Sequence, residues 1–197
     1  MKMLKLRELT MEHHKTAERS EFAKKLVSGK VNALEYSTYL YNMGFVYGAL
    51  ENTAKSLGCL DGIESICRTD NIWKDYHEME EYPPLPPLLV SVFDYINHMD
   101  ALRYDKQKLL AHIYVRHMGD LSGGQIIAKR LGDKFPTNFY QFDEDQDMLK
   151  EKLREKLNND MADEAMVAFE WAHRIFLELD KLTNDNSKPE GNSETSE

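Results

Sequence analysis

Two short stretches of this chain carry polar side chains at spacings that could support chemistry. The first, "YVRHMGDLSGGQ" at residues 114–125, places Arg116 and Asp120 one helical turn apart. A carboxylate among apolar residues is costly to bury alone, so Asp120 indicates a polar site that Arg116 can face directly or through water. The second, "HKTAE", places His14 and Glu18 on one helix face. Such a pair can hold a metal-ligating imidazole, or it can be a solvated surface pair.

Three glycines, Gly119, Gly123 and Gly124, interrupt a stretch whose flanks both have helical apolar spacing. Each glycine in a helix interior costs about 1 kcal/mol relative to alanine. Two interpretations are open. Either Gly119 ends one helix and the glycine pair links it to another, or one helix continues with a bend. In the second case, the missing side chains let the backbone approach a flat ligand closely.

The composition is typical of a soluble, folded protein. The chain has 197 residues, of which 42% are hydrophobic and 30% are charged. A formal net charge of −9 argues against nucleic-acid binding, which needs a basic surface. The sequence has no apolar run long enough for a membrane anchor and no secretory signal core. Because Cys59 and Cys67 lack metal-finger spacing, we expect reduced thiols in a cytoplasmic protein, although a plastid or viral origin also fits.

Helical signals dominate, and they predict an all-α fold with one domain at residues 1–182 and a disordered tail at 183–197. The first helix is expected to begin near Leu4. Four prolines between residues 83 and 87 predict a connector. A short helix is expected between the cap Ser20 and the stop Gly29, and a long helix is expected to begin at an Asn32–Glu35 capping box. Further helices are expected before the prolines and at residues 88–99 and 148–159. An apolar seam on the last helix comprises Ala165, Phe169, Ala172, Phe176 and Leu179.

The stretch "YVRHMGDLSGGQ" resembles the distal-helix segment of the biliverdin-forming heme oxygenases, whose pattern is close to YxRYLGDLSGGQ. The chain departs from that pattern mainly at His117 and Met118, which replace a tyrosine and a leucine. The family also has its proximal histidine in an HxxAE segment near the N-terminus, which favours His14 over His13. The resemblance covers most of the chain up to the tail. It implies a heme oxygenase-like helical bundle with heme b between the N-terminal and distal helices.

The resemblance also implies roles for particular residues. His14 would ligate the iron and Glu18 would orient it, while Tyr47, Arg116 and Asp120 would order the water that delivers a proton to oxygen. Ala172 stands where many relatives have an asparagine. The remaining heme contacts implied are Gly119, Ser122, Gly123 and Gly124 over the ring, Arg7, Tyr114, Lys150 and Arg154 at the propionates, and Phe169 and Phe176 in the wall.

The reaction implied by the resemblance is oxidative cleavage of heme by O2 to biliverdin, with the alpha isomer expected, carbon monoxide and ferrous iron. Heme would then be both substrate and cofactor. No flavin or nicotinamide fingerprint is visible in the sequence, so a partner such as ferredoxin or a reductase must supply electrons. We expect a monomer that docks this donor on a basic cluster comprising Lys129, Arg130, Lys150, Lys152, Arg154 and Lys156.

Two other functions are considered. A non-catalytic heme carrier or sensor on the same fold would have lost the distal polar residues, whereas Tyr47, Arg116 and Asp120 are all present. A carboxylate di-iron bundle would use the Glu-x-x-His spacing found at Glu170 and His173. Such bundles need this motif twice and two further glutamates, and the sequence has the motif once.

Overall fold

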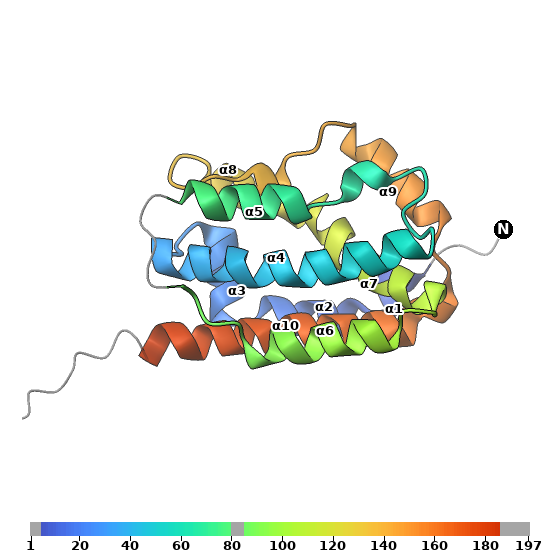
Figure 1. The fold of residues 1–197 in the computed structure, drawn as a ribbon, viewed down its shortest axis with the longest axis horizontal. Coiled ribbons are helices and arrows are strands. Elements are labelled where there is room, and N and C mark those ends of the chain that lie inside the picture. The colour runs from blue at the N-terminus through green and yellow to red at the C-terminus, as the bar shows by residue number, and fades with distance from the viewer. Residues whose placement is uncertain (1–4, 80–84, 186–197) are drawn as a thin grey trace, which may run out of the picture.

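The fold consists of helices joined by short connections (Figure 1). The structure is a computed structural model that describes residues 5–79 and 85–185. Within these ranges it contains no strand, which confirms the predicted all-α class. The α-helices are α1 (Leu6–Leu9), α2 (Met11–Glu18), α3 (Glu21–Ser28), α4 (Ala33–Ser56), α5 (Thr69–Glu78), α6 (Val90–Ala101), α7 (Lys106–Asp120), α8 (Gly123–Leu131), α9 (Gln146–Glu155) and α10 (Ala162–Asp185). The 3-10 helices are η1 (Glu64–Ile66), η2 (Asn138–Tyr140) and η3 (Asn159–Met161).

The helix-capping signals read from the sequence are confirmed at α3 and α4. The Ser20 hydroxyl accepts a hydrogen bond from the Ala23 amide at 3.2 Å, and Gly29 ends α3 with a left-handed φ of 70°. At the start of α4, the Asn32 side chain accepts from the Glu35 amide and the Glu35 carboxylate accepts from the Asn32 amide, both at 2.9 Å. These reciprocal bonds satisfy amides that a helix start leaves unpaired. They therefore determine where the central helix α4 begins.

Two predicted boundaries are wrong. The first helix is not continuous, because Thr10 has a φ of −101° and separates α1 from α2. Its hydroxyl donates to the Leu6 carbonyl at 2.9 Å, a bond that competes with regular helix geometry. The last helix continues to Asp185, three residues into the predicted tail. The rest of that tail, residues 186–197, and part of the proline connector, residues 80–84, lie outside the described residues.

The glycine-rich stretch matches neither of the interpretations left open by the sequence. Helix α7 includes Gly119 and ends at Asp120, and Gly123 and Gly124 are the first residues of α8 rather than a linker. The break falls between them, at Leu121 and Ser122. The Ser122 amide bonds to the Gly119 carbonyl at 3.2 Å, which tightens the last turn, and a ψ of −77° at Ser122 redirects the chain.

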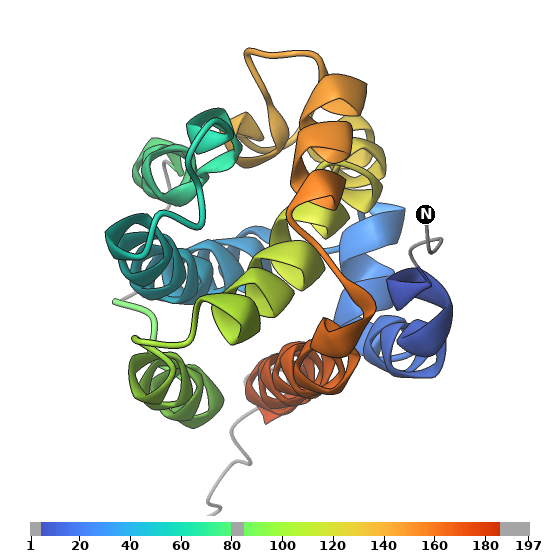
Figure 2. The same ribbon diagram turned by 90° about the vertical axis from the view of Figure 1, so that its right-hand side faces the viewer.

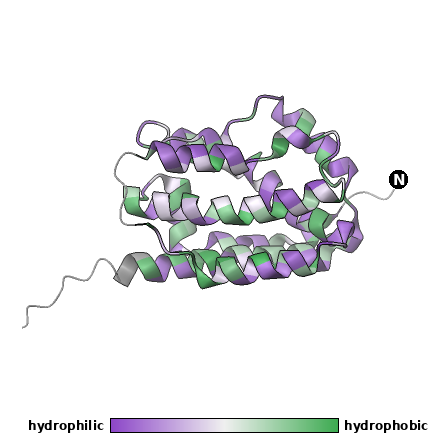
Figure 3. Ribbon diagram, viewed as in Figure 1, coloured by the Kyte–Doolittle hydropathy of each residue, from purple (hydrophilic) through white to green (hydrophobic). Residues whose placement is uncertain are grey.

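Helices α4, α7 and α10 form the centre of the bundle. Helix α4 packs against α5, α6 and α7, and α10 packs against α2, α3, α6 and α7. Figure 2 shows α6 and α10 nearly end-on and side by side, with α7 crossing above them. Hydrophobic and hydrophilic residues are interleaved along the helices (Figure 3), as expected for helices that bury one face. None of the helices in residues 5–79 and 85–185 is long and apolar enough to span a membrane.

The predicted seam of α10 is confirmed as an inward face. Ala165, Phe169, Ala172 and Leu179 are buried, and Phe176 is partly buried against the core. This face brings α10 against both the N-terminal helices and α7. Helix α10 thus connects the two segments that carry the predicted chemistry.

Two glycines one turn apart on α4 provide a test of this packing. A methyl group at Gly44 would lie 2.5 Å from the Trp73 indole of α5, whereas at Gly48 it would meet Thr69 at an ordinary 3.7 Å. We expect Gly44→Ala to lower the free energy of unfolding by about 1–3 kcal/mol through overpacking. The control, Gly48→Ala, should raise it by up to about 1 kcal/mol through helix propensity. Urea denaturation measures both, and equal effects would contradict the α4–α5 packing.

Candidate functional site

A buried tyrosine–aspartate pair lies between α4 and α7. The Tyr47 hydroxyl donates to Asp120 Oδ2 at 2.7 Å, and only 2% and 7% of the two residues are exposed. Burial raises the pKa of Asp120 to about 6, although the charges of His117 and Arg116 and the Tyr47 hydrogen bond favour the ionised form. A carboxyl group with such a pKa can hold or release a proton near neutral pH. The structure therefore brings together two of the three predicted catalytic residues.

The third, Arg116, is buried beside them but does not form an ion pair with Asp120 among the described residues. Its guanidinium carbon lies 5.2 Å from the centroid of the Tyr95 ring. Two of its nitrogens, Nε and Nη2, are buried without a hydrogen-bond partner within residues 5–79 and 85–185. Unpaired buried donors are costly, so this arrangement fits a site completed by a polar ligand or by water. The direct interaction is not made, and the water-mediated one stays a prediction.

A second buried pair, which sequence reasoning missed, supports the first. His117 Nε2 lies 3.0 Å from Glu51 Oε1, and both side chains are at most 2% exposed. Glu51 also accepts hydrogen bonds from the Arg68 amide at 2.6 Å and the Thr69 hydroxyl at 2.5 Å. The His117 ring is 5.2 Å from the Tyr47 ring. One signal was available, because Glu51 follows Tyr47 by four residues and therefore shares its helix face.

The predicted proximal pair forms on α2. His14 Nδ1 lies 3.4 Å from Glu18 Oε2, and the His14 side chain is 45% exposed. The ring meets Phe169 of α10 edge-on, with centroids 5.4 Å apart. Because Glu18 contacts Nδ1, Nε2 is the nitrogen left to face a metal ion. The neighbouring His13 contacts Glu170 instead, at 3.7 Å.

The glycines of the α7–α8 junction differ from one another. A side chain at Gly119 or Gly123 would meet no described atom within 4 Å, and both residues are exposed, as is Ser122. Gly124 is buried, and a methyl group there would lie 2.6 Å from the Tyr140 ring. Gly119 and Gly123 therefore leave space for a flat ligand, whereas the requirement for glycine at 124 is explained by the packing of Tyr140.

Three of the four predicted propionate contacts gather at one edge of the bundle. Tyr114 of α7 is partly buried, and burial raises its pKa. A hydrogen bond with Thr10 and the charges of Arg7 and Arg154 act in the opposite direction, so both arginines lie near its hydroxyl. The cluster joins α1, α7 and α9 and offers two cations to a carboxylate-bearing ligand.

Two other predicted heme contacts have different partners. Lys150 bonds to Asp147 at 3.2 Å, one turn earlier on α9. Phe176 stacks on Phe22 of α3 at a centroid distance of 5.9 Å, within the core.

The Glu170–His173 motif does not assemble the ligand set of a di-iron site. In the part of the chain that the structure describes, the only three His, Cys, Asp or Glu side chains that lie close enough together to hold one metal ion are His98, His112 and Glu164.

A heme-binding helical protein needs an imidazole that can ligate iron, and the chain offers His14 for this role, together with the open backbone of Gly119 and Gly123 and the buried Asp120 carboxyl group. The family model for heme oxygenase matches residues 3–178, and the chain therefore belongs to the heme oxygenase family. It is 29% identical to a heme oxygenase of Guillardia theta, over 90% of this chain and 85% of that protein.

Two solved structures have the same fold. The crystal structure of heme oxygenase-1 from the cyanobacterium Synechocystis, in complex with heme, has a TM-score of 0.80 and 25% identity, covering 92% of this chain and 93% of the other. The heme oxygenase of Leptospira interrogans has a TM-score of 0.76 and 26% identity, covering 87% and 96%. Both agree with the all-α fold predicted from the sequence.

The burial of Asp120 predicts a pH-dependent stability. Because its pKa rises from 3.8 to about 6 on folding, the folded state binds more protons between these values, and stability is lost as pH rises through this window. Asp120→Asn removes the ionisable carboxyl group, so the variant does not lose this stability as pH rises. Between pH 4 and pH 7, the stability of this variant relative to the wild type should increase by up to about 3 kcal/mol.

Urea denaturation of the heme-free proteins at both pH values measures this change. The control is Asp94→Asn, an exposed aspartate on α6, whose effect should stay within about 0.5 kcal/mol at either pH. If Asp120→Asn followed the wild type at a constant offset, Asp120 would not have the raised pKa.

Proposed function

We propose that this protein is a heme oxygenase that cleaves heme b with O2 and externally supplied electrons to biliverdin, carbon monoxide and ferrous iron. The main support is the buried hydrogen bond from Tyr47 to Asp120. The Asp120 carboxyl group has a pKa of about 6, and it lies next to the open surface of Gly119 and Gly123. Family membership and the heme-bound Synechocystis structure support the same function.

The residues present fit heme. His14 is an exposed imidazole oriented by Glu18, and it would hold the iron. Arg7, Tyr114 and Arg154 would hold the propionates at their common edge. When bound, heme supplies the iron that activates O2 and the ring that is oxidised. Because all of these residues come from one chain, we propose that a monomer is the active unit.

The distal residues would control a proton. Asp120 exchanges it at its carboxyl group, and Tyr47 holds that group in place by donating to Oδ2. Arg116 presents buried, unpaired N–H groups that can orient a water molecule next to the carboxylate. Gly119 and Gly123 let a planar ring lie against the backbone, which would limit the ring edges open to attack.

Replacing the distal carboxylate tests the catalytic role. We expect Asp120→Ala to bind hemin with a Soret band but to form biliverdin at least 10-fold more slowly, since one general acid contributes about 10²–10⁴-fold. Biliverdin absorbance and released carbon monoxide, with ascorbate as reductant, measure turnover. The exposed control Asp94→Ala should react like the wild type. Wild-type turnover by Asp120→Ala would remove Asp120 from the mechanism.

Replacing the proximal histidine tests the heme orientation. We expect His14→Ala to lose the histidine-ligated ferrous–CO absorption spectrum and most of its turnover, because the iron loses its axial imidazole. The matched control, His13→Ala, removes an imidazole that faces Glu170 and should keep the wild-type spectrum. An unchanged spectrum for His14→Ala would show that another residue ligates the iron.

We also propose that an acidic donor such as ferredoxin docks beside the heme edge, on the basic residues of α8 and α9. Lys150 and Lys152 are paired with Asp147 and Glu144, whereas Lys129 and Arg130 are exposed in the last turn of α8. Exposed cations raise association rates with an acidic partner. Lys129→Glu with Arg130→Glu should slow turnover with ferredoxin several-fold and leave the ascorbate-driven rate unchanged. Equal rates with ferredoxin would rule out this surface.

A further inference from the structure

A second cluster of ligand-type side chains lies where α6, α7 and α10 meet. His98 comes from α6, His112 from α7 and Glu164 from α10. Both imidazoles direct Nε2 at the same carboxylate oxygen, Glu164 Oε1, at 2.8 Å for His98 and 3.1 Å for His112. The three ligand atoms lie within 4.8 Å of one another. None of these residues belongs to the proposed heme site.

The donor set suits a transition metal. Imidazole binds zinc, iron, nickel and copper, and two imidazoles with one carboxylate form a three-ligand set with open positions for water. At Zn–N and Zn–O bonds of about 2.0–2.1 Å, tetrahedral ligand atoms lie roughly 3.4 Å apart. The distances of 2.8 and 3.1 Å therefore need to widen by only about half an ångström.

The surroundings of the cluster orient it for ligation. The Tyr95 hydroxyl lies 2.8 Å from His112 Nδ1, so the outer nitrogen is held and Nε2 faces inward, as in metal sites with a supporting hydrogen bond. Lys108 contacts the other carboxylate oxygen, Glu164 Oε2, at 3.5 Å and leaves Oε1 to the histidines.

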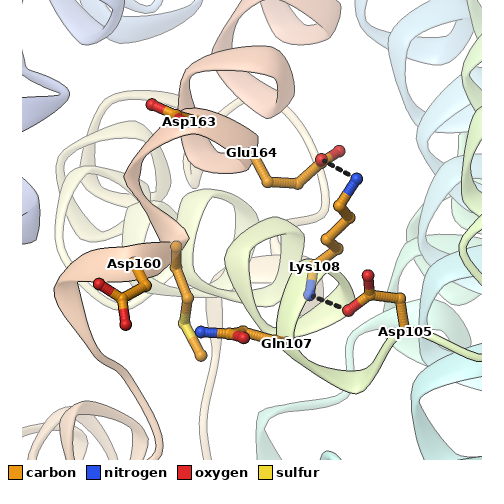
Figure 4. Close-up of a pocket in the computed structure, with 7 residues that line it drawn as sticks. Asp105, Gln107, Lys108, Asp160, Asp163 and Glu164 are labelled. Carbon is orange, nitrogen blue, oxygen red and sulfur yellow. Dashed lines mark hydrogen bonds and ion pairs between the residues drawn. The ribbon is translucent and has the colours of Figure 1, made fainter.

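The cluster is partly open to solvent. Glu164 lines a pocket of about 280 Å³ at the beginning of α7 (Figure 4). The pocket is also lined by Asp105, Asp160 and Asp163, whose carboxylates attract cations, and by one cation, Lys108. The His98 side chain is 28% exposed, whereas His112 is fully buried. The site thus has a solvent-facing histidine and a buried histidine, and its glutamate borders a largely acidic pocket.

We propose that His98, His112 and Glu164 bind a divalent first-row transition-metal ion, through Nε2 of each histidine and Oε1 of the glutamate. The ion joins the consecutive helices α6 and α7 to the distant helix α10. It therefore binds the folded chain more tightly than the unfolded one, and binding raises the melting temperature. The site is independent of the proposed heme chemistry, because it uses none of the heme contacts.

Calorimetric titration of the full chain with Zn2+, in heme-free and heme-loaded form, tests the site. We expect one ion per chain with micromolar or tighter affinity in both forms and a higher Tm in the presence of Zn2+. His98→Gln and Glu164→Gln should each weaken binding at least 10-fold. The control His77→Gln, at an exposed histidine on α5, should bind like the wild type.

The heme-free form contains a second possible zinc ligand, His14, and His14→Ala addresses it directly. Retained binding by His14→Ala supports the proposed site, and lost binding would place the ion at the heme site instead. Wild-type affinity in both His98→Gln and Glu164→Gln, with folding verified by circular dichroism, would overturn the proposal. The proposal would also be overturned if the wild-type chain bound no Zn2+ at concentrations up to about 1 mM, at which even a site of millimolar affinity is half occupied.

Discussion

The distal site depends on one buried carboxylate, Asp120, held by a hydrogen bond from a tyrosine on another helix. Burying this group favours its neutral form, and the Tyr47 hydroxyl and the nearby positive charges favour its ionised form. The balance leaves its pKa at about 6, where a small change in surroundings moves a proton. Helices α4 and α7 must therefore pack in the register that lets the Tyr47 hydroxyl reach Asp120.

The layer behind this carboxylate distinguishes the chain from the family pattern it resembles. His117 stands where that pattern has a tyrosine, and it forms a buried pair with Glu51. The His117 imidazole acts to lower the pKa of Asp120, an effect that a neutral phenol would not have. Glu51 is anchored in turn by the amides of Arg68 and Thr69, so the pair connects the site to the start of α5. The replacement therefore changes the electrostatics of the distal site without changing the fold.

Helix α7 serves two polar clusters at once. Arg116 and Asp120 face the distal site, and His112, one turn earlier than Arg116, faces Glu164. Tyr95 of α6 contacts both sides, through its ring to Arg116 and its hydroxyl to His112. Tyr95 therefore lies between the two clusters, which share no ligand side chain.

Local features of this protein could be predicted from the sequence because their partners are close along the chain. The Asn32–Glu35 capping box and the His14–Glu18 pair form within one helical turn, and the helical periods predicted the all-α class. The Tyr47–Asp120 bond joins residues 73 positions apart, and sequence resemblance, not spacing, indicated it. Only the tertiary structure decided where α7 ends, that Gly124 makes room for Tyr140, and that His98, His112 and Glu164 converge. Each of these depends on how helices pack, and helix periodicity specifies which face is buried but not which helix covers it.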